Sequence, residues 1–234
     1  AFRSGWDKDA FIAQVFLKSQ MISGWNGENA GTYRLRGLGQ NWATGTSDRV
    51  RKRQYENVVW MPEADLHDGA RGKLTHFAAD GKTMVLSVDL NEVYERSGRH
   101  WYTKYGELRF PTIMPAKGDE QIPPPSGITG MRAMAFDYSG VSGAPCLFVV
   151  VDKIDGGAEM MRRWLFQPPL AANTGKPKPG AKSPIAEVVN PTHDGFTVNP
   201  PGAKGMLRGT FAHPAKVEVS TDPIKYSYIK NFGK

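Results

Sequence analysis

The sequence predicts an all-β protein, built as a two-layer antiparallel β-sandwich with a smaller C-terminal β-sheet. Three observations support this fold class. Short segments rich in β-branched and aromatic residues recur along the 234 residues, and turn residues separate them. Apolar and polar residues alternate in residues 84–89 and 216–220, so that every second side chain can face a core. No segment keeps a helical period beyond about ten residues.

The expected strands fall into three groups in chain order. The first group covers residues 11–18, 32–38, 54–61, 73–79 and 83–90; the second covers 107–114, 131–138, 146–154 and 162–167; the third covers 185–189, 195–199, 205–211 and 216–220. Residues 147–151 form an unbroken apolar run, which is typical of a central strand covered on both faces. Residues 90–94 are expected to form one helical turn.

Turn chemistry connects several of these strands. Asp-Gly pairs at residues 68–69, 80–81 and 194–195 are strong hairpin signals, because both residue types tolerate a positive φ. The Pro-Pro-Gly sequence at residues 200–202 predicts one more hairpin.

The composition of the chain divides it into three parts. Residues 1–170 are expected to form the main sandwich, residues 171–184 a Pro/Lys/Gly-rich linker loop, and residues 185–234 a C-terminal sheet and tail. The lysines of the linker indicate either a solvated connection or an arm that binds glycan or phosphate.

Charge and composition restrict the possible partners. The net charge of +7 favours an acidic glycan, a nucleic acid or an anionic lipid surface. No apolar run approaches the ~18 residues of a membrane span, and the lone Cys146 excludes a disulfide scaffold. The chain begins Ala-Phe-Arg-Ser, without an initiator methionine, so we expect a processed or excerpted chain.

Metal, cofactor and nucleic-acid sites find little support. The five histidines are scattered and never have ligand spacing, so no metal site and no cofactor is expected. The basic run at residues 49–53 could meet a polyanion or form a charged edge strand that discourages edge pairing. Nucleic-acid binding is not expected, because no recognisable module accompanies the run.

The most informative stretch is a glycine-bounded bend at residues 24–35. Its amides, Asn26 and Asn29, would project from a loop that leads into a strand, where binding sites are often found. Asx-turn chemistry ahead of a strand explains the same residues, and both interpretations stay open.

Several motifs in order resemble the β-sandwich part of heparinase II/III-like polysaccharide lyases. They are R-x-G-W-D-x-D-A at residues 3–10, a turn ending A-G-x-[FY] at 30–33, G-L-G-Q-N-W-A at 37–43, Y-E-N-V-V at 55–59, Arg132 ahead of F-V-V-V-D-K at 148–153, and W-L at 164–165. Together they cover most of residues 1–220.

The resemblance implies a secreted or periplasmic protein that acts on acidic, uronic-acid polysaccharide. In that family an N-terminal (α/α) toroid packs on the sandwich, and the glycan is cleaved by β-elimination. The toroid is not in this chain, so the resemblance also implies a missing N-terminal region or a separate chain as partner. β-Elimination needs the uronate carboxylate neutralised, a proton removed from C5 and a proton supplied to the leaving oxygen.

This sequence departs from the family where the family's histidines would lie. Trp25, Gly27 and Asn29 occupy the turn that usually carries a histidine pair and an acid, and Glu56 replaces the histidine of the Ser-His-Asn strand. Phe166 or Gln167 stands where another histidine is expected.

Two hypotheses follow for the function. In the first, the chain is the sandwich of a divergent lyase-like protein, with Asn26, Asn29 and Tyr33 as catalytic candidates and Trp25, Glu28, Arg34 and Arg36 as substrate-binding candidates. In the second, it is a non-catalytic glycan-binding or structural module that kept the fold without the chemistry. The missing histidines favour the second.

Overall fold

The computed structural model describes residues 1–17, 29–45, 53–64, 71–95, 124–169, 188–213 and 217–221. The expected strand at 107–114, the Asp-Gly turn at 68–69 and the linker at 171–184 lie outside these ranges. Strands dominate the described residues, which contain no α-helix and a single 3₁₀ turn, η1 (Arg53–Tyr55). The described residues include no candidate for a membrane-spanning helix.

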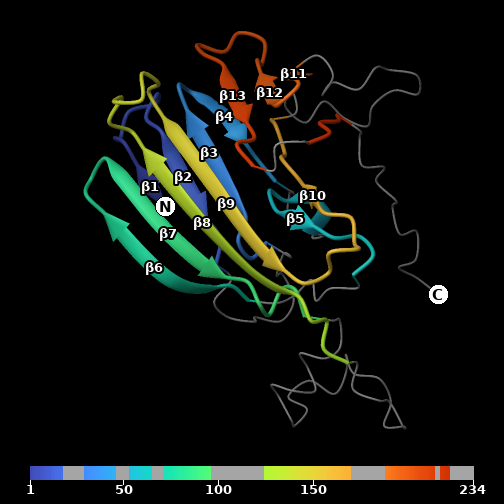
Figure 1. Ribbon diagram of the computed structural model, residues 1–234. Helices are drawn as coiled ribbons and strands as arrows, with labels where there is room; N and C mark the ends of the chain where they lie inside the picture. Colours follow the sequence, from blue (N-terminus) through green and yellow to red (C-terminus); the bar gives the residue numbers. More distant parts are fainter. Residues whose placement is uncertain are drawn as a thin grey trace, which may run out of the picture.

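Two four-stranded antiparallel sheets form the main body (Figure 1). The first sheet has the order β1 (Phe2–Arg3), β2 (Ile12–Val15), β3 (Tyr33–Gly37) and β4 (Gln40–Ala43). The second has the order β6 (Lys73–Ala79), β7 (Thr83–Asp89), β8 (Thr129–Asp137) and β9 (Leu147–Asp155). Both are meanders, since each strand pairs with its neighbour in sequence.

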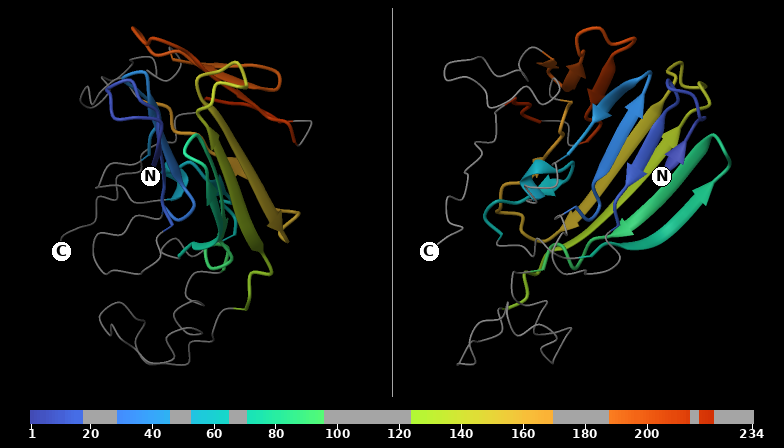
Figure 2. Two further views of the ribbon diagram at one scale, coloured as in Figure 1. Left: turned by 90° about the vertical axis from the view of Figure 1, so that its left-hand side faces the viewer. Right: turned by 180° about the vertical axis from the view of Figure 1, so that it is seen from behind.

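The two sheets lie face to face, as the left view of Figure 2 shows. Alternate residues of each sheet point into the space between them and are buried, among them Ala13, Tyr33 and Leu35 from the first sheet and Leu86, Met134 and Phe136 from the second. Tyr33 packs edge-on against Phe148 of β9, with ring centroids 4.6 Å apart. The two-layer all-β sandwich that the strand patterns predict is therefore confirmed.

Two smaller sheets complete the fold. β5 (Val59–Trp60) pairs with β10 (Arg163–Trp164), and β11 (Val189–Pro191), β12 (Gly195–Val198) and β13 (Leu207–Thr210) form the C-terminal sheet. The C-terminal sheet has a small core of its own, in which the aromatic rings of residues 164 and 166 pack in tilted and edge-on contacts against those of residues 196 and 211. These contacts attach it to β10 and to the segment that follows.

The predicted hairpins at residues 80–81, 194–195 and 200–202 are present. β6 and β7 meet at Asp80-Gly81, where the φ of Gly81 is 92°, and β11 and β12 join around Asp194. The Pro-Pro-Gly sequence connects β12 to β13. The expected helical turn after β7 is also present, because the N–H of Tyr94 donates to the carbonyl of Leu90.

Three strand predictions are wrong. Residues 54–61, expected to form one strand, contain the end of η1 and the two-residue β5. Residues 217–220 have no strand structure. Leu147–Val151 was expected to be a covered central strand, but β9 is an edge strand whose outward side chains at 147, 149 and 151 are exposed. Only the inward face of β9 meets the first sheet.

Candidate functional site

The outer face of the first sheet carries the two arginines that sequence analysis selected. Tyr33 and Leu35 of β3 point into the core, so Arg34 and Arg36 must point outward by strand alternation. Arg36 lies opposite Ile12 on one side and Asn41 on the other, and Arg34 lies opposite Gln14. Directly opposed residues share a face of the sheet, so these side chains form one surface.

A shallow groove of about 340 Å³ runs over this surface. The residues lining it are Ile12, Gln14, Arg34, Leu35, Arg36, Asn41, Ala43, Thr44 and Gly45. Its polar groups are two guanidinium groups, two amides and a hydroxyl. Arg36 is exposed and forms no ion pair with another described residue. A guanidinium of this kind can bind a carboxylate through two parallel hydrogen bonds.

Arg34 is fixed in place by its neighbours. Its Nη2 lies 2.6 Å from Oε2 of Glu56, a buried carboxylate. Its Nη1 donates to Oγ1 of Thr32 at 3.1 Å and to the carbonyl oxygen of Tyr33 at 3.0 Å. The guanidinium passes directly over Gly45, where any Cβ would overlap it. Arg34 is therefore a rigid, charge-compensated wall of the groove, and Arg36 supplies its net positive charge.

Asn57, buried beneath the groove, joins four chain segments. Its Nδ2 donates to the carbonyl oxygens of Tyr33 at 2.8 Å and Thr44 at 2.5 Å. Its Oδ1 accepts from the N–H of Gln167 at 2.6 Å, and its own N–H donates to Oγ1 of Thr32 at 3.0 Å. A buried amide that is hydrogen-bonded on both its nitrogen and its oxygen rigidifies its surroundings. Asn57 therefore holds the start of β3 and the end of β4 in place.

Arg132 of β8 links the two layers of the sandwich. Its side chain is 1% exposed, and its Nε and Nη2 bind the carboxylate of Asp152 at 2.6 and 2.8 Å. Its Nη1 donates to the carbonyl oxygens of Gly31 at 2.9 Å and Asn57 at 2.5 Å. Burial disfavours this charged guanidinium, but the charge of Asp152, the hydrogen bonds to it and the smaller effects of Tyr33 and Tyr94 together raise the pKa of Arg132.

Asn29 and Tyr33, the other predicted site residues that the structure describes, do not line the groove. Trp25, Asn26 and Glu28 lie outside the described residues. The carbonyl of Asn29 accepts from the N–H of Thr32 at 3.0 Å, which makes this residue part of a turn. Tyr33 is buried against the second sheet, where desolvation raises the pKa of its phenol far above the ordinary 10.0. In that position its hydroxyl is a core group that solvent does not reach.

Several groove residues were missed from the sequence. Gln14 and Asn41 follow from strand alternation once β2 and β4 are aligned with β3, so the signal was present. Gly45 and Glu56 become significant only because they contact Arg34. They lie 11 and 22 residues after Arg34 in the chain. No pattern in the local sequence predicts contacts of this kind.

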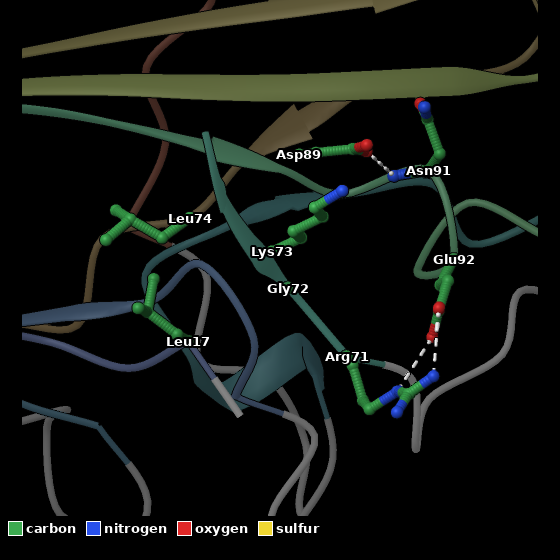
Figure 3. A pocket seen from close by; sticks show the side chains of 8 residues that line it. All are labelled: Leu17, Arg71, Gly72, Lys73, Leu74, Asp89, Asn91 and Glu92. Atoms are coloured by element: carbon green, nitrogen blue, oxygen red, sulfur yellow. Dashed lines mark hydrogen bonds and ion pairs between the residues drawn. The ribbon is translucent and has the colours of Figure 1, made fainter. Parts of the chain in front are cut away.

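A second hollow, of about 460 Å³, lies where β6 begins and β7 ends (Figure 3). Its lining is Leu17, Arg71, Gly72, Lys73, Leu74, Asp89, Asn91 and Glu92. Most of its polar groups are already engaged: Arg71 binds the carboxylate of Glu92 with two contacts of 3.2 Å, and Asp89 accepts from the N–H of Asn91 at 2.8 Å. It is therefore a weaker candidate than the groove.

Metal and thiol chemistry have no support in the part of the chain that the structure describes. No group of three or more His, Cys, Asp or Glu side chains there could hold a metal ion. Cys146 is half-buried, and desolvation raises its pKa to about 11, which keeps the thiol protonated at neutral pH.

No protein-family model matches this chain, and no curated protein is significantly similar to it.

Proposed function

We propose that this chain binds acidic, uronic-acid polysaccharide in the groove over β2, β3 and β4. The observation that supports this most is the pair of outward arginines, Arg34 and Arg36, flanked by the amides of Gln14 and Asn41. Guanidinium groups pair with carboxylates, and side-chain amides can both donate to and accept from sugar hydroxyls.

The shape and charge of the site favour a polymer over a small metabolite. The groove is shallow and open, whereas small-molecule sites usually enclose most of their ligand. The chain's net charge of +7 would add a long-range attraction toward a polyanion that weakens with salt.

Recognition without cleavage is the version that the described residues favour. Tyr33, the candidate base, is buried, and Glu56, at the position of a family histidine, is committed to Arg34. In the fuller proposal, which rests on the lyase resemblance, a toroid region or a separate chain supplies the proton-transfer groups. A periplasmic or secreted location belongs to the same proposal.

The experiment is a binding and cleavage assay with defined ligands. Oligosaccharides of heparan, chondroitin, alginate and hyaluronan are titrated by calorimetry, with neutral dextran as a negative ligand. Arg36→Ala should weaken binding of the acidic oligosaccharides at least tenfold. Arg208→Ala, which removes an exposed strand arginine from β13, should leave binding unchanged.

Two outcomes would count against the proposal. Equal affinity of the wild-type chain and Arg36→Ala for every acidic ligand would remove the groove from consideration. Formation of the unsaturated-uronate absorbance by the chain alone would overturn recognition without cleavage and support the lyase hypothesis.

A further inference from the structure

The exposed indole of Trp6 lies at the end of the sheet that carries the groove, and nothing in the proposed function uses it. We propose that Arg3 of β1 and Trp6 of the following loop form a second sugar subsite, so that an oligosaccharide crosses the strands from Asn41 to Trp6. This inference rests on the proposed function and extends it to the length and charge spacing of the ligand.

Strand register places Arg3 in line with the groove. Arg3 lies opposite Ile12, Ile12 lies opposite Arg36, and Arg36 lies opposite Asn41. The neighbouring residue Phe2 points inward, because its ring stacks on Tyr138 with centroids 5.1 Å apart. Arg3 therefore points outward by alternation, and one row of side chains crosses all four strands.

Trp6 is stacked on this row and open to solvent. The guanidinium carbon of Arg3 lies 3.9 Å from the centroid of the indole ring, which is a cation–π contact. The Nε of Arg3 is buried and has no hydrogen-bond partner among the residues that the structure describes. Trp6 itself is 86% exposed, although tryptophan side chains are on average highly buried. One face of the ring rests on Arg3, and the rest of the ring is available to a ligand.

The loop that carries Trp6 is already ordered by hydrogen bonds. Ser4 exchanges two of them with the backbone of Phe11, each of 2.9 Å, and Asp7 accepts from the N–H of Asp9 at 2.9 Å. Lys204 binds the carboxylate of Asp9 at 2.5 Å, which ties the loop to the C-terminal sheet. A platform held in this way loses little entropy when a ligand binds.

The spacing of the row suggests the ligand. Arg3 and Arg36 lie two strands apart, about 10 Å by the usual separation of paired strands. That is close to the length of a disaccharide unit. A sugar ring stacked on Trp6 through its C–H face would place one acidic group near Arg3 while a second binds Arg36. The ligand class is therefore an acidic oligosaccharide whose charged groups recur on alternate sugars.

The experiment compares short and long ligands. Hyaluronan oligosaccharides of two and six sugars are titrated against the wild-type chain, Trp6→Ala, Arg3→Ala and Arg36→Ala. Trp6→Ala and Arg3→Ala should weaken the six-sugar ligand at least fivefold and leave the two-sugar ligand unchanged. In the wild-type chain, the six-sugar ligand should also change tryptophan fluorescence, and Trp6→Ala should abolish that change.

A second arginine–tryptophan stack provides the matched control. Arg163 lies over the ring of Trp60 at 5.9 Å on β10 and β5, away from the row, and Arg163→Ala should bind both ligands like the wild type. If Arg36→Ala abolishes binding while Trp6→Ala binds the six-sugar ligand at wild-type affinity, the second subsite is refuted and the proposed function stands. If the wild-type chain binds neither ligand nor any other acidic oligosaccharide, both fail.

Discussion

Arg34 and Glu56 form an ion pair of 2.6 Å in which the carboxylate side chain is 3% exposed and the arginine 19%. The glutamate comes from the segment after η1 and the arginine from the outer face of β3. The pair therefore connects the groove to the interior of the protein. It also compensates the charge of Arg34, so that ligand affinity should depend on Arg36 more than on Arg34.

Removing the carboxylate should destabilise the protein. Glu56→Gln leaves the partly buried guanidinium of Arg34 without its counter-ion, and we expect a loss of about 2–4 kcal/mol in the free energy of unfolding. Urea denaturation measures the change. Glu159→Gln, at an exposed position, should shift stability by less than about 0.5 kcal/mol. Equal stability of the two variants would show that Arg34 does not need its partner.

Adding a methyl group beneath Arg34 should disturb the groove. In Gly45→Ala the new Cβ would overlap the guanidinium, and such overpacking costs about 1–3 kcal/mol. In the double variant Gly45→Ala with Arg34→Ala the overlap is gone, so the two losses should not add. Additive losses in a urea-denaturation cycle would refute the close approach of Arg34 to Gly45.

Breaking the buried pair of Arg132 and Asp152 should have a large effect. Arg132→Met leaves a carboxylate and two carbonyl groups without their donor, and we expect a loss of about 3–5 kcal/mol. Lys153→Met is the control: it removes one partner of the exposed ion pair between Lys153 and Asp155 of β9, which lie 3.4 Å apart. It should lower the free energy of unfolding by less than about 1 kcal/mol. A comparable loss in both variants, measured by thermal or chemical unfolding, would contradict the bridging role of Arg132.

Alkaline pH should unfold the protein through its buried phenols. Burial raises the pKa of Tyr33 and of Tyr94 above the ordinary value of 10.0. Because the folded pKa lies above the unfolded one, this stabilisation is complete below pH 10 and is lost as the pH rises further. Tyrosinate absorbance should therefore appear for these groups together with loss of structure, and Tyr33→Phe should weaken the pH dependence. Titration of Tyr33 within the folded protein would contradict its burial.

Local chemistry predicted the hairpins well and the strand environments less well. The turn at Asp80-Gly81 predicts β6 and β7 because the strands it joins are adjacent in the chain. The environment of Val149 and Val151 depends on what covers the outer face of β9, and an apolar run carries no such information. The same limit applies to residues 54–61: Asn57, and Arg53 just before this segment, bond to distant backbone groups, and the chain does not extend as one strand.

The groove likewise combines features that the sequence predicts with features that only the folded structure reveals. Arg34 and Arg36 share a face because they are two residues apart on a strand, and that much follows from the sequence. Their neighbours Gln14 and Asn41 require the strand register. The charge compensation of Arg34 requires Glu56, which reaches β3 only after the chain has folded back. Tyr33 illustrates the opposite case, since its neighbours in sequence are polar and its position in the fold is buried.

The partnership of Arg132 with Asp152 constrains the order in which the chain assembles. These residues lie directly opposite each other on adjacent strands, so their charges can neutralise one another while the hairpin is still in water. Docking a lone guanidinium between the layers first would incur its full desolvation cost. We therefore expect residues 129–155 to pair early, and the N-terminal sheet to close over them afterwards.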